Sequence, residues 1–320
     1  MNAWVKLGNI FTPTRNSEWM SSHAAVPFVE KLIGSQIKIY FSSRNQHNKS
    51  LIGWVIIDIE NPAVILKISS DPIMDLGGAG FFDEDGVMGC ELVHINESKY
   101  LYYVGWNIGS IIPFRNAIGL AIFNNNLNRF VKYSDGPILD RSIYDPCFVA
   151  SNCVLQKDGE FLMYYLSCIK WEIVNQKYNH QYHIKMASSN DGINWNREGR
   201  VVIDFEHKNE YAISVPRVLL IHGKYRMWYS YRGSSLNDTY RIGYAESDNA
   251  LDWIRKDDQV GIDVSKDGWD SEMICYPYIF EYKTDYYMLY NGNEYGKRGF
   301  GIAKMKKEND SDEDKYEEQW

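Results

Sequence analysis

The chain has 320 residues, of which 45% are hydrophobic and 15% aromatic, and its formal net charge is −8 at pH 7. This acidic balance argues against a general nucleic-acid binder, which usually carries a basic face. No stretch is long and apolar enough to cross a membrane as a helix. The five cysteines are odd in number and lack CxxC spacing, so they indicate neither a disulfide framework nor a zinc site.

A strand–turn–strand pattern recurs along the chain, each time as an apolar strand, a polar turn and a second strand rich in Tyr, Met and Ile. The copies lie at 28–44, 92–106, 153–167, 217–233 and 278–292. Two copies continue into a third strand, at 182–199 and 240–258. Self-similarity at a period of tens of residues, with several short strands per unit, is typical of β-propellers. Five copies therefore predict an all-β, five-bladed β-propeller.

The repeat runs without a linker, which predicts a single propeller domain over residues 1–306. The acidic run at 307–320 offers little apolar surface to offset the entropy of ordering, so we expect a disordered tail that can be removed. The N-terminus lacks a basic region followed by an apolar run, which argues against a signal peptide and favours a cytoplasmic location. The segment SSNDGINW (188–195) predicts an Asp-Gly turn, with Trp195 packing between two blades.

Strand direction in a propeller predicts that two kinds of segment meet at one mouth of the central channel: those before each first strand and those after each second strand. Acids recur at nearly the same register before the first strands of the later copies, and the candidate catalytic residues are Asp83, Asp145, Glu210, Asp270 and Glu272. The candidate substrate-binding residues are His23, Arg44, Trp106, Trp171, Arg232, Tyr276 and Asn293.

A cluster of carboxylates with aromatic neighbours suits glycoside chemistry. Cleavage of an acetal needs one carboxylic acid to protonate the leaving oxygen and a second carboxylate to activate water or attack the anomeric carbon. Glu272 is the expected proton donor, because two residues after Asp270 in an extended strand it should share a face with that acid and keep its proton. Asp83 is then the expected base or nucleophile, and Asp145 should orient the sugar.

Two alternatives stay open for these residues. Acids at the entrances of blades also cap turns and accept hydrogen bonds from backbone N–H groups, so each could have a purely structural role. Arg44 and Arg232 follow equivalent strands, where they could hold a phosphate or carboxylate of a ligand or could neutralise the acids.

Four segments carry a resemblance to a bacterial family of glycosidase-like five-bladed propellers, often found in surface-polysaccharide gene sets. They are GGAGFFDEDGVMG (77–89), YDPCFVAS (144–151), EYAISVPRVL (210–219) and GWDSEMICYPYIF (268–280). More remotely, the chain resembles the superfamily of β-fructosidases, arabinanases and mannoside phosphorylases. The resemblance covers nearly the whole chain and implies the propeller fold and activity on carbohydrates.

The catalytic set of the β-fructosidases does not carry over to this chain. Their Asn-Asp-Pro motif of the first blade would fall in SSHAAVPFV (21–29), which contains no acid. Their Arg-Asp-Pro motif is similar to Tyr144-Asp145-Pro146 without the Arg, and their Glu-Cys-Pro motif would fall on Ser214-Val215-Pro216. An enzyme with this sequence would therefore have to draw its acids from elsewhere around the channel.

The leading hypothesis is a carbohydrate-active enzyme that acts on a glycosidic bond, by hydrolysis or by transfer to phosphate or another sugar. A cytoplasmic address favours a nucleotide-sugar, oligosaccharide or glycan-precursor substrate in glycan or surface-polysaccharide metabolism. The alternative is a sugar-binding propeller without catalysis. A protein-interaction propeller of the WD-repeat kind fits less well, because its Gly-His and Trp-Asp signatures are missing. The sequence indicates no cofactor and no obligatory metal.

Overall fold

The computed structural model describes residues 3–13, 17–174, 176–233 and 238–305, and these form an all-β fold of twenty strands. The predicted tail at 307–320 lies outside the described residues. No α-helix occurs in the described ranges, which contain only two short 3-10 turns, η1 (Asp257–Gln259) and η2 (Asn293–Gly296). Within the same ranges, nothing helical has the length and hydropathy that crossing a membrane requires.

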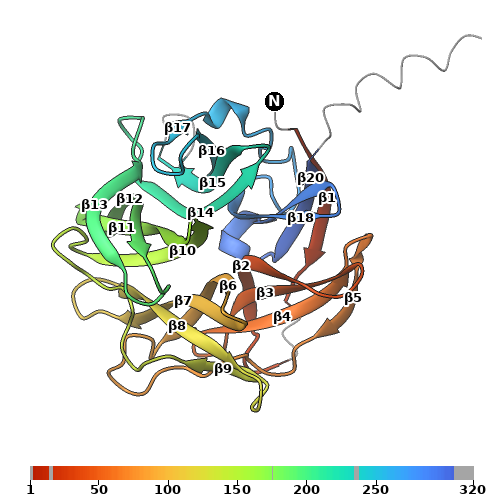
Figure 1. The fold of residues 1–320 in the computed structure, drawn as a ribbon, viewed down its shortest axis with the longest axis horizontal. Helices are drawn as coiled ribbons and strands as arrows, with labels where there is room; N and C mark the ends of the chain where they lie inside the picture. The colour runs from red at the N-terminus through yellow and green to blue at the C-terminus, as the bar shows by residue number, and fades with distance from the viewer. Residues whose placement is uncertain (1–2, 14–16, 175, 234–237, 306–320) are drawn as a thin grey trace, which may run out of the picture.

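The strands form antiparallel groups of four in chain order, arranged around a common centre (Figure 1). The first two groups contain β2 (Ser22–Lys31), β3 (Gln36–Arg44), β4 (Ser50–Asp58), β5 (Asn61–Ile68), β6 (Gly86–Ile95), β7 (Ser98–Ile108), β8 (Phe114–Asn124) and β9 (Arg129–Lys132). The next two contain β10 (Phe148–Lys157), β11 (Glu160–Val174), β12 (Lys177–Ser189), β13 (Asn196–Ile203), β14 (Ala212–Ile221), β15 (Lys224–Arg232), β16 (Arg241–Ser247) and β17 (Ile254–Arg255).

The last group joins the two ends of the described chain. Its order is β18 (Cys275–Tyr282), β19 (Asp285–Asn291), β20 (Phe300–Met305) and then β1 (Trp4–Phe11), which pairs antiparallel with β20. Each first strand contacts the first strand of the next group, and β18 contacts β2. The first strands β2, β6, β10, β14 and β18 therefore surround the centre of the molecule.

The hydrophobic core lies between neighbouring groups, where aromatic side chains of one group pack on the turns of another. Tyr102 packs edge-on against Trp195 at 6.1 Å between ring centroids and donates a hydrogen bond to the carbonyl of Gly192. Tyr164 makes the equivalent contacts with Trp253 and the carbonyl of Ala250. The predicted Asp-Gly turn and the packing of Trp195 between groups are therefore confirmed.

Every first strand carries a β-bulge at the same level, next to the centre. The register shifts fall at Val26-Pro27, Cys90, Ser151, Val215-Pro216 and Tyr276-Pro277. A proline fits within a strand mainly at such a bulge, because it cannot donate to the ladder. A bulge re-aims the side chain of the extra residue, so each first strand can turn one side chain toward the central space.

Candidate active site

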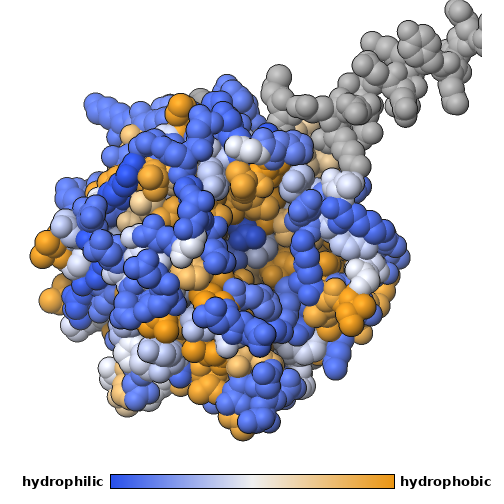
Figure 2. Space-filling model, in the orientation of Figure 1, coloured by the Kyte–Doolittle hydropathy of each residue, from blue (hydrophilic) through white to orange (hydrophobic). Residues whose placement is uncertain are grey.

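A cavity of about 260 Å³ lies at the centre of the fold, where the bulged first strands meet. All five bulges contribute to its wall, and the aromatic and polar side chains around them come from several groups. Figure 2 shows a hollow near the centre of the molecule, with hydrophilic atoms inside it and hydrophobic atoms around parts of its edge. The residues that define its chemistry are Val26, Phe114, Asn116, Ser151, His180, Tyr182, Val215, Arg232, Tyr240, Tyr276 and Tyr295.

Three of the bulges hold a residue other than glycine in the left-handed region. The φ angles of Val26, Val215 and Tyr276 are 52°, 49° and 56°. A residue held in this region costs about 1–3 kcal/mol and persists only where its surroundings enforce it. Side chains of neighbouring strands do so here, because Asn291 accepts from the N–H of Val26 at 2.9 Å and Ser230 accepts from that of Tyr276 at 2.7 Å. The wall of the cavity is therefore built from strained but firmly held backbone.

One wall of the cavity belongs to the hairpin of β11 and β12, whose strands are 15 and 13 residues long and exceed all others. His180 on β12 faces Trp171 on β11 at 4.8 Å between ring centroids, and it stacks on Tyr182 at 4.9 Å. The Tyr182 hydroxyl in turn forms a short hydrogen bond with that of Tyr240. Flat aromatic faces beside hydroxyl groups are suited to stack on sugar rings and to bind their hydroxyls.

Arg232, at the end of β15, is the cation that lines the cavity. Its guanidinium lies over the ring of Tyr240 at 4.6 Å and over that of Tyr211 at 5.1 Å, and it donates to the hydroxyl of Tyr295 at 2.9 Å. These rings position the cation without neutralising it. Burial lowers the pKa of His180 to about 4, and the positive charge of Arg232 adds to this effect.

His23, at the start of β2, is a second histidine that stays neutral at pH 7. Burial is the main cause that lowers its pKa to about 4, and the charges of Arg44 and Lys297 add to it. Burial also lowers the pKa of Arg44. A neutral His23 thus lies near the charge of Arg44, while the nearby carboxylate of Glu294 accepts a hydrogen bond from Lys297.

We expect acid to destabilise the protein through His180. Its folded pKa lies below the ordinary 6.5, so between about pH 4 and 6.5 the unfolded chain binds more protons than the folded one. Stability should therefore fall as the pH is lowered through this window, by up to about 3 kcal/mol from this residue. Thermal unfolding at pH 7.5 and 4.5 measures the effect. The loss should be smaller in His180→Phe and unchanged in a His47→Gln control, whose imidazole is exposed.

Three of the predicted catalytic acids occupy one repeated structural environment. Asp83, Asp145 and Asp270 are buried, with 2% exposure or less. Each accepts a hydrogen bond from a tyrosine on the second strand of its own group and pairs with a cation on the outermost strand. The tyrosines are Tyr103, Tyr165 and Tyr290, at 3.0, 3.2 and 3.0 Å. The cations are Lys132, Arg197 and Lys6, at 2.6, 3.0 and 2.7 Å.

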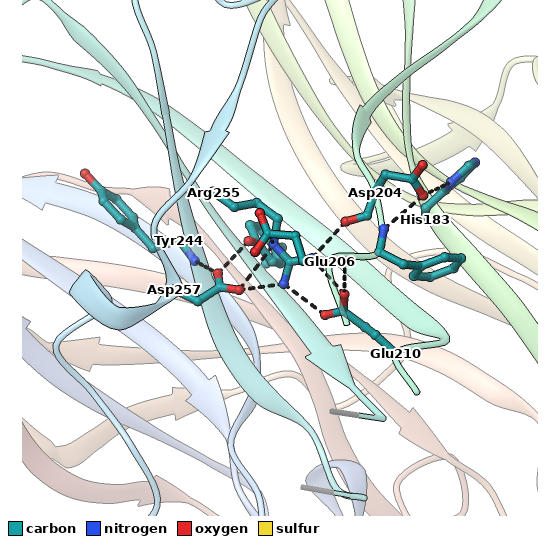
Figure 3. A network of polar contacts seen from close by, with 9 residues as sticks. His183, Asp204, Glu206, Glu210, Tyr244, Arg255 and Asp257 are labelled. Atoms are coloured by element: carbon teal, nitrogen blue, oxygen red, sulfur yellow. Dashed lines mark hydrogen bonds and ion pairs between the residues drawn. The ribbon is translucent and has the colours of Figure 1, made fainter. Parts of the chain in front are cut away.

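Glu210 forms a variation of the same arrangement (Figure 3). Both of its carboxylate oxygens accept from Arg255 on β17, at 2.8 and 2.9 Å, and one also accepts from the N–H of Glu206. Arg255 reaches Asp257 as well, at 2.5 Å, and the second-strand Tyr229 donates to Asp257 instead of to Glu210. The bidentate pair clamps the loop before β14 to the outermost strand of its own group.

The register of these acids therefore reflects a repeated anchor between the loop before each first strand and the outermost strand. None of the five predicted acids is among the residues that line the cavity. The first group lacks an acid at this position and uses aromatic packing instead, with Trp19 stacked on Phe41 at 6.2 Å. A catalytic role for the acids stays a prediction, but the contacts of Asp83, Asp145, Glu210 and Asp270 are those of structural ion pairs.

The expected geometry of Asp270 and Glu272 is wrong. The strand begins only at Cys275, so the two acids lie in a bent segment and do not share a strand face. Asp270 is buried against Lys6, whereas the side chain of Glu272 is exposed. The backbone carbonyl of Glu272 accepts hydrogen bonds from Thr239 and Arg241. Glu272 thus lies one residue before Met273, which is buried in the same cluster as the cavity residues Tyr182 and Tyr240.

The predicted substrate-binding residues separate into three sets. Arg232 and Tyr276 line the cavity, and Trp171 packs behind its wall. His23 and Arg44 lie close enough to each other to interact electrostatically, as do Arg44 and Tyr276. The remaining two have structural contacts, because Trp106 donates to Ser50 and the amide oxygen of Asn293 accepts from the N–H groups of residues 272 and 273.

Several cavity residues were missed in the sequence, and two signals could have found them. The Val-Pro and Tyr-Pro pairs inside predicted strands indicate bulges, which often lie beside sites. The third predicted strand at 182–199 follows a polar, aromatic stretch too long for a tight turn, which indicates a projecting hairpin with His180.

As for metals, the described residues contain no group of three or more His, Cys, Asp or Glu side chains that could hold an ion.

Comparison of sequences relates the chain to known proteins. No model of a protein family matches it. The uncharacterized protein Rv1502 of Mycobacterium tuberculosis is 38% identical over 301 residues, which are 94% of this chain and 98% of that protein. A 1,2-β-oligomannan phosphorylase of a Thermoanaerobacter species is 41% identical over 71 residues, which are 22% of this chain and 24% of the phosphorylase.

Solved structures with the same fold include several glycoside hydrolases. One glycoside hydrolase superposes with a TM-score of 0.75 at 17% identity, over 94% of this chain and 91% of the other protein. A thermostable family-43 glycoside hydrolase gives 0.65 at 18% identity, over 92% and 91%. A member of the mannoside phosphorylase family, described as containing hydrolases for β-1,2 mannosidic linkages in Candida mannan, gives 0.66 at 15%, over 95% and 93%. The fold is thus the propeller fold of glycoside hydrolases and mannoside phosphorylases, and the chain belongs to the same family as the mycobacterial protein Rv1502.

Proposed function

We propose that this protein is a carbohydrate-active enzyme that acts on a glycosidic bond, with the central cavity as its substrate site. The observation that carries the proposal is the composition of that cavity. Aromatic rings, hydroxyls, an amide and a guanidinium from several strand groups meet there, on backbone held in strained bulges. Local strain and convergent polar groups in an otherwise apolar cavity are features of functional sites.

The fold supports the same proposal. We infer that the antiparallel groups of four strands are the blades of a five-bladed propeller, with the first strands innermost. The fold neighbours include glycoside hydrolases and mannoside phosphorylases, and a partial relative is named as an oligomannan phosphorylase. A cavity of about 260 Å³ is small beside the roughly 300–1,000 Å³ of sites for drug-sized ligands. We propose a soluble glycan precursor in the cytoplasm as the substrate, such as an oligosaccharide or a nucleotide sugar, of which the cavity would enclose only a part.

Glu272 remains our candidate for the general acid, on different grounds from those of the sequence. Its carboxylate forms no ion pair with another described residue, unlike the four anchored acids. It precedes Met273, which packs in the cluster that surrounds the cavity. In the proposed step its proton passes to the leaving oxygen as the bond from the anomeric carbon to that oxygen breaks. Water, phosphate or another sugar then bonds to the anomeric carbon through an oxygen, and the proton that this oxygen releases returns to the carboxylate of Glu272.

A sugar-binding propeller without catalysis is the second candidate, and one observation favours it. None of the described residues that line the cavity is an Asp or Glu. A protein that only binds a sugar needs the aromatic faces and the donors but no acid beside the anomeric carbon.

The deciding experiment is a panel of aryl glycosides and oligosaccharides, incubated with and without inorganic phosphate, with products separated by chromatography. A free sugar indicates hydrolysis, and a sugar 1-phosphate indicates phosphorolysis. Glu272→Gln should lower kcat on the unactivated substrate by roughly two to four orders of magnitude, the usual contribution of a general acid. Glu198→Gln, which changes an exposed carboxylate on β13, should have no effect.

Two outcomes would contradict parts of this proposal. Near-full turnover by Glu272→Gln would exclude Glu272 as the proton donor. Sugar binding by the wild type without turnover of any panel member would favour the non-catalytic candidate.

A further inference from the structure

Arg232 differs from three other largely buried arginines in forming no ion pair with a described carboxylate. Arg217, Arg255 and Arg197 each lie within 3.0 Å of a carboxylate oxygen, and each is less than one-fifth exposed. Arg232 is also largely buried, but it forms no ion pair with any carboxylate of the described residues, and its Nε has no hydrogen-bond partner among them. A buried guanidinium without a counter-charge is costly unless a ligand supplies one.

The surroundings of Arg232 hold it ready for such a ligand. Tyrosine rings lie over its planar group, and one terminal nitrogen donates to the hydroxyl of Tyr295, while the buried Nε makes no hydrogen bond to a described residue. Because Arg232 lines the cavity, we infer that a ligand there approaches the terminal nitrogens of the guanidinium. The edge of a guanidinium fits the two oxygens of a carboxylate or phosphate bidentately.

His180 is a second largely buried polar residue of the cavity wall. His180 lines the cavity, and its Nδ1 has no hydrogen-bond partner among the described residues. Its pair of ring nitrogens lets it donate to a ligand oxygen from a neutral imidazole. The described lining residues contribute no negative charge, because none is an Asp or Glu. The cavity of this acidic protein is therefore locally positive.

We propose that the cavity recognises a sugar unit that itself carries a negative group, a carboxylate or a phosphate, with that group bound by Arg232 and the sugar ring against the aromatic walls. The cavity volume of about 260 Å³ far exceeds an inorganic anion, and Phe114, Tyr240 and Tyr276 offer apolar surface that a bare anion cannot use. The inference rests on the proposed function for the identity of the ligand as a sugar. Beyond that function, it states that the sugar is anionic.

Calorimetric titration of the whole protein tests the proposal by binding alone, so its outcome is independent of turnover. The probes are D-glucuronate, D-glucose 1-phosphate, D-glucose and inorganic phosphate. At least one charged sugar should bind about tenfold to a hundredfold more tightly than glucose, as hydrogen bonds to charged groups predict. The same charged sugar should also bind more tightly than inorganic phosphate. Comparing glucuronate with glucose 1-phosphate shows which group the site prefers.

Variants assign the preference to the guanidinium. Arg232→Gln should reduce the charged-to-neutral ratio to near one, and Arg232→Lys should recover only part of it, because an ammonium cannot bind bidentately. Arg200→Gln, which removes an exposed arginine paired with Asp252, should leave the ratio unchanged. Thermal unfolding of each variant checks that it is folded.

Three results would overturn the proposal: equal binding of charged and neutral sugars by the wild type, equal binding of inorganic phosphate and the charged sugar, or a preserved preference in folded Arg232→Gln. The wild-type titrations decide even if that variant does not fold. Arg232-dependent binding without glycoside turnover would support this inference while contradicting the proposed enzyme activity.

Discussion

Replacing Asp145 by alanine should lower the free energy of unfolding by about 3–5 kcal/mol, the usual result of removing one partner of a buried ion pair. Asp145 is fully buried, and Arg197 and Lys185 lie 3.0 and 3.6 Å from its oxygens. Ser167 also donates to it, at 2.7 Å. Without the carboxylate, two largely buried cations lose their counter-charge and a hydroxyl loses its acceptor. Denaturant unfolding followed by circular dichroism measures the loss.

The same residue distinguishes a structural acid from a catalytic one. Asp145→Asn keeps the shape and most acceptor sites but removes the charge, so a structural role predicts a clear loss of stability. A catalytic role instead predicts normal stability and a large loss of kcat. Asp252→Ala is the matched control. It breaks the ion pair between Asp252 and Arg200, in which the side chain of Asp252 is 76% exposed. That control should change stability little, since exposed pairs contribute little.

Breaking the largely buried ion pair between Glu91 and Arg217 should have an effect of similar size. Glu91 on β6 accepts from Arg217 on β14 at 2.6 Å and from the hydroxyl of Tyr278 on β18 at 3.3 Å. The guanidinium also lies 4.0 Å from the centre of the Tyr278 ring and donates to the carbonyl of Ile279. One cluster thus connects three of the first strands across the centre, and burial places it in a medium where an unpaired charge is costly.

Glu91→Leu and Arg217→Met should each cost about 3–5 kcal/mol, because each leaves a buried partner uncompensated. The double variant Glu91→Leu/Arg217→Met should lose less free energy of unfolding than the two single losses add up to. Replacing a buried ion pair by apolar groups is often nearly neutral for stability. A double-mutant cycle in denaturant unfolding measures this coupling. Additive effects would show that the two side chains do not act as a pair. The exposed Arg129–Asp75 pair supplies a control cycle, in which little coupling is expected.

The two ion-pair systems suggest how the cavity can carry an unpaired cation. The anchored acids join each loop to its own outermost strand, and the Glu91–Arg217 pair joins first strands beneath the cavity. These contacts hold the surrounding backbone, including the strained bulges at Val26 and Val215. These ion pairs can hold the unpaired guanidinium of Arg232 in place, and a bound ligand would then supply its negative partner.

The sequence by itself determined the strands and the way they repeat. The strand–turn–strand copies, the Asp191-Gly192 turn and the packing of Trp195 depend on short-range patterns, in which apolar alternation and turn residues act over a few positions. Those patterns are sufficient to predict an all-β propeller class. They also identified Arg232 and Tyr276, because strand ends and first strands converge on the centre in any such fold.

Only the tertiary structure decided which charges face the cavity. The acid register suggested convergence on one mouth, but Lys6 meets Asp270 across 264 positions and Arg197 meets Asp145 across 52. Which cation lies on an outermost strand opposite a given acid depends on long-range strand pairing, which local patterns do not contain. The same pairing leaves Arg232 among tyrosines without a carboxylate. The carboxylates took structural positions because a buried acid is stabilised by a nearby cation, and the outermost strands supply those cations.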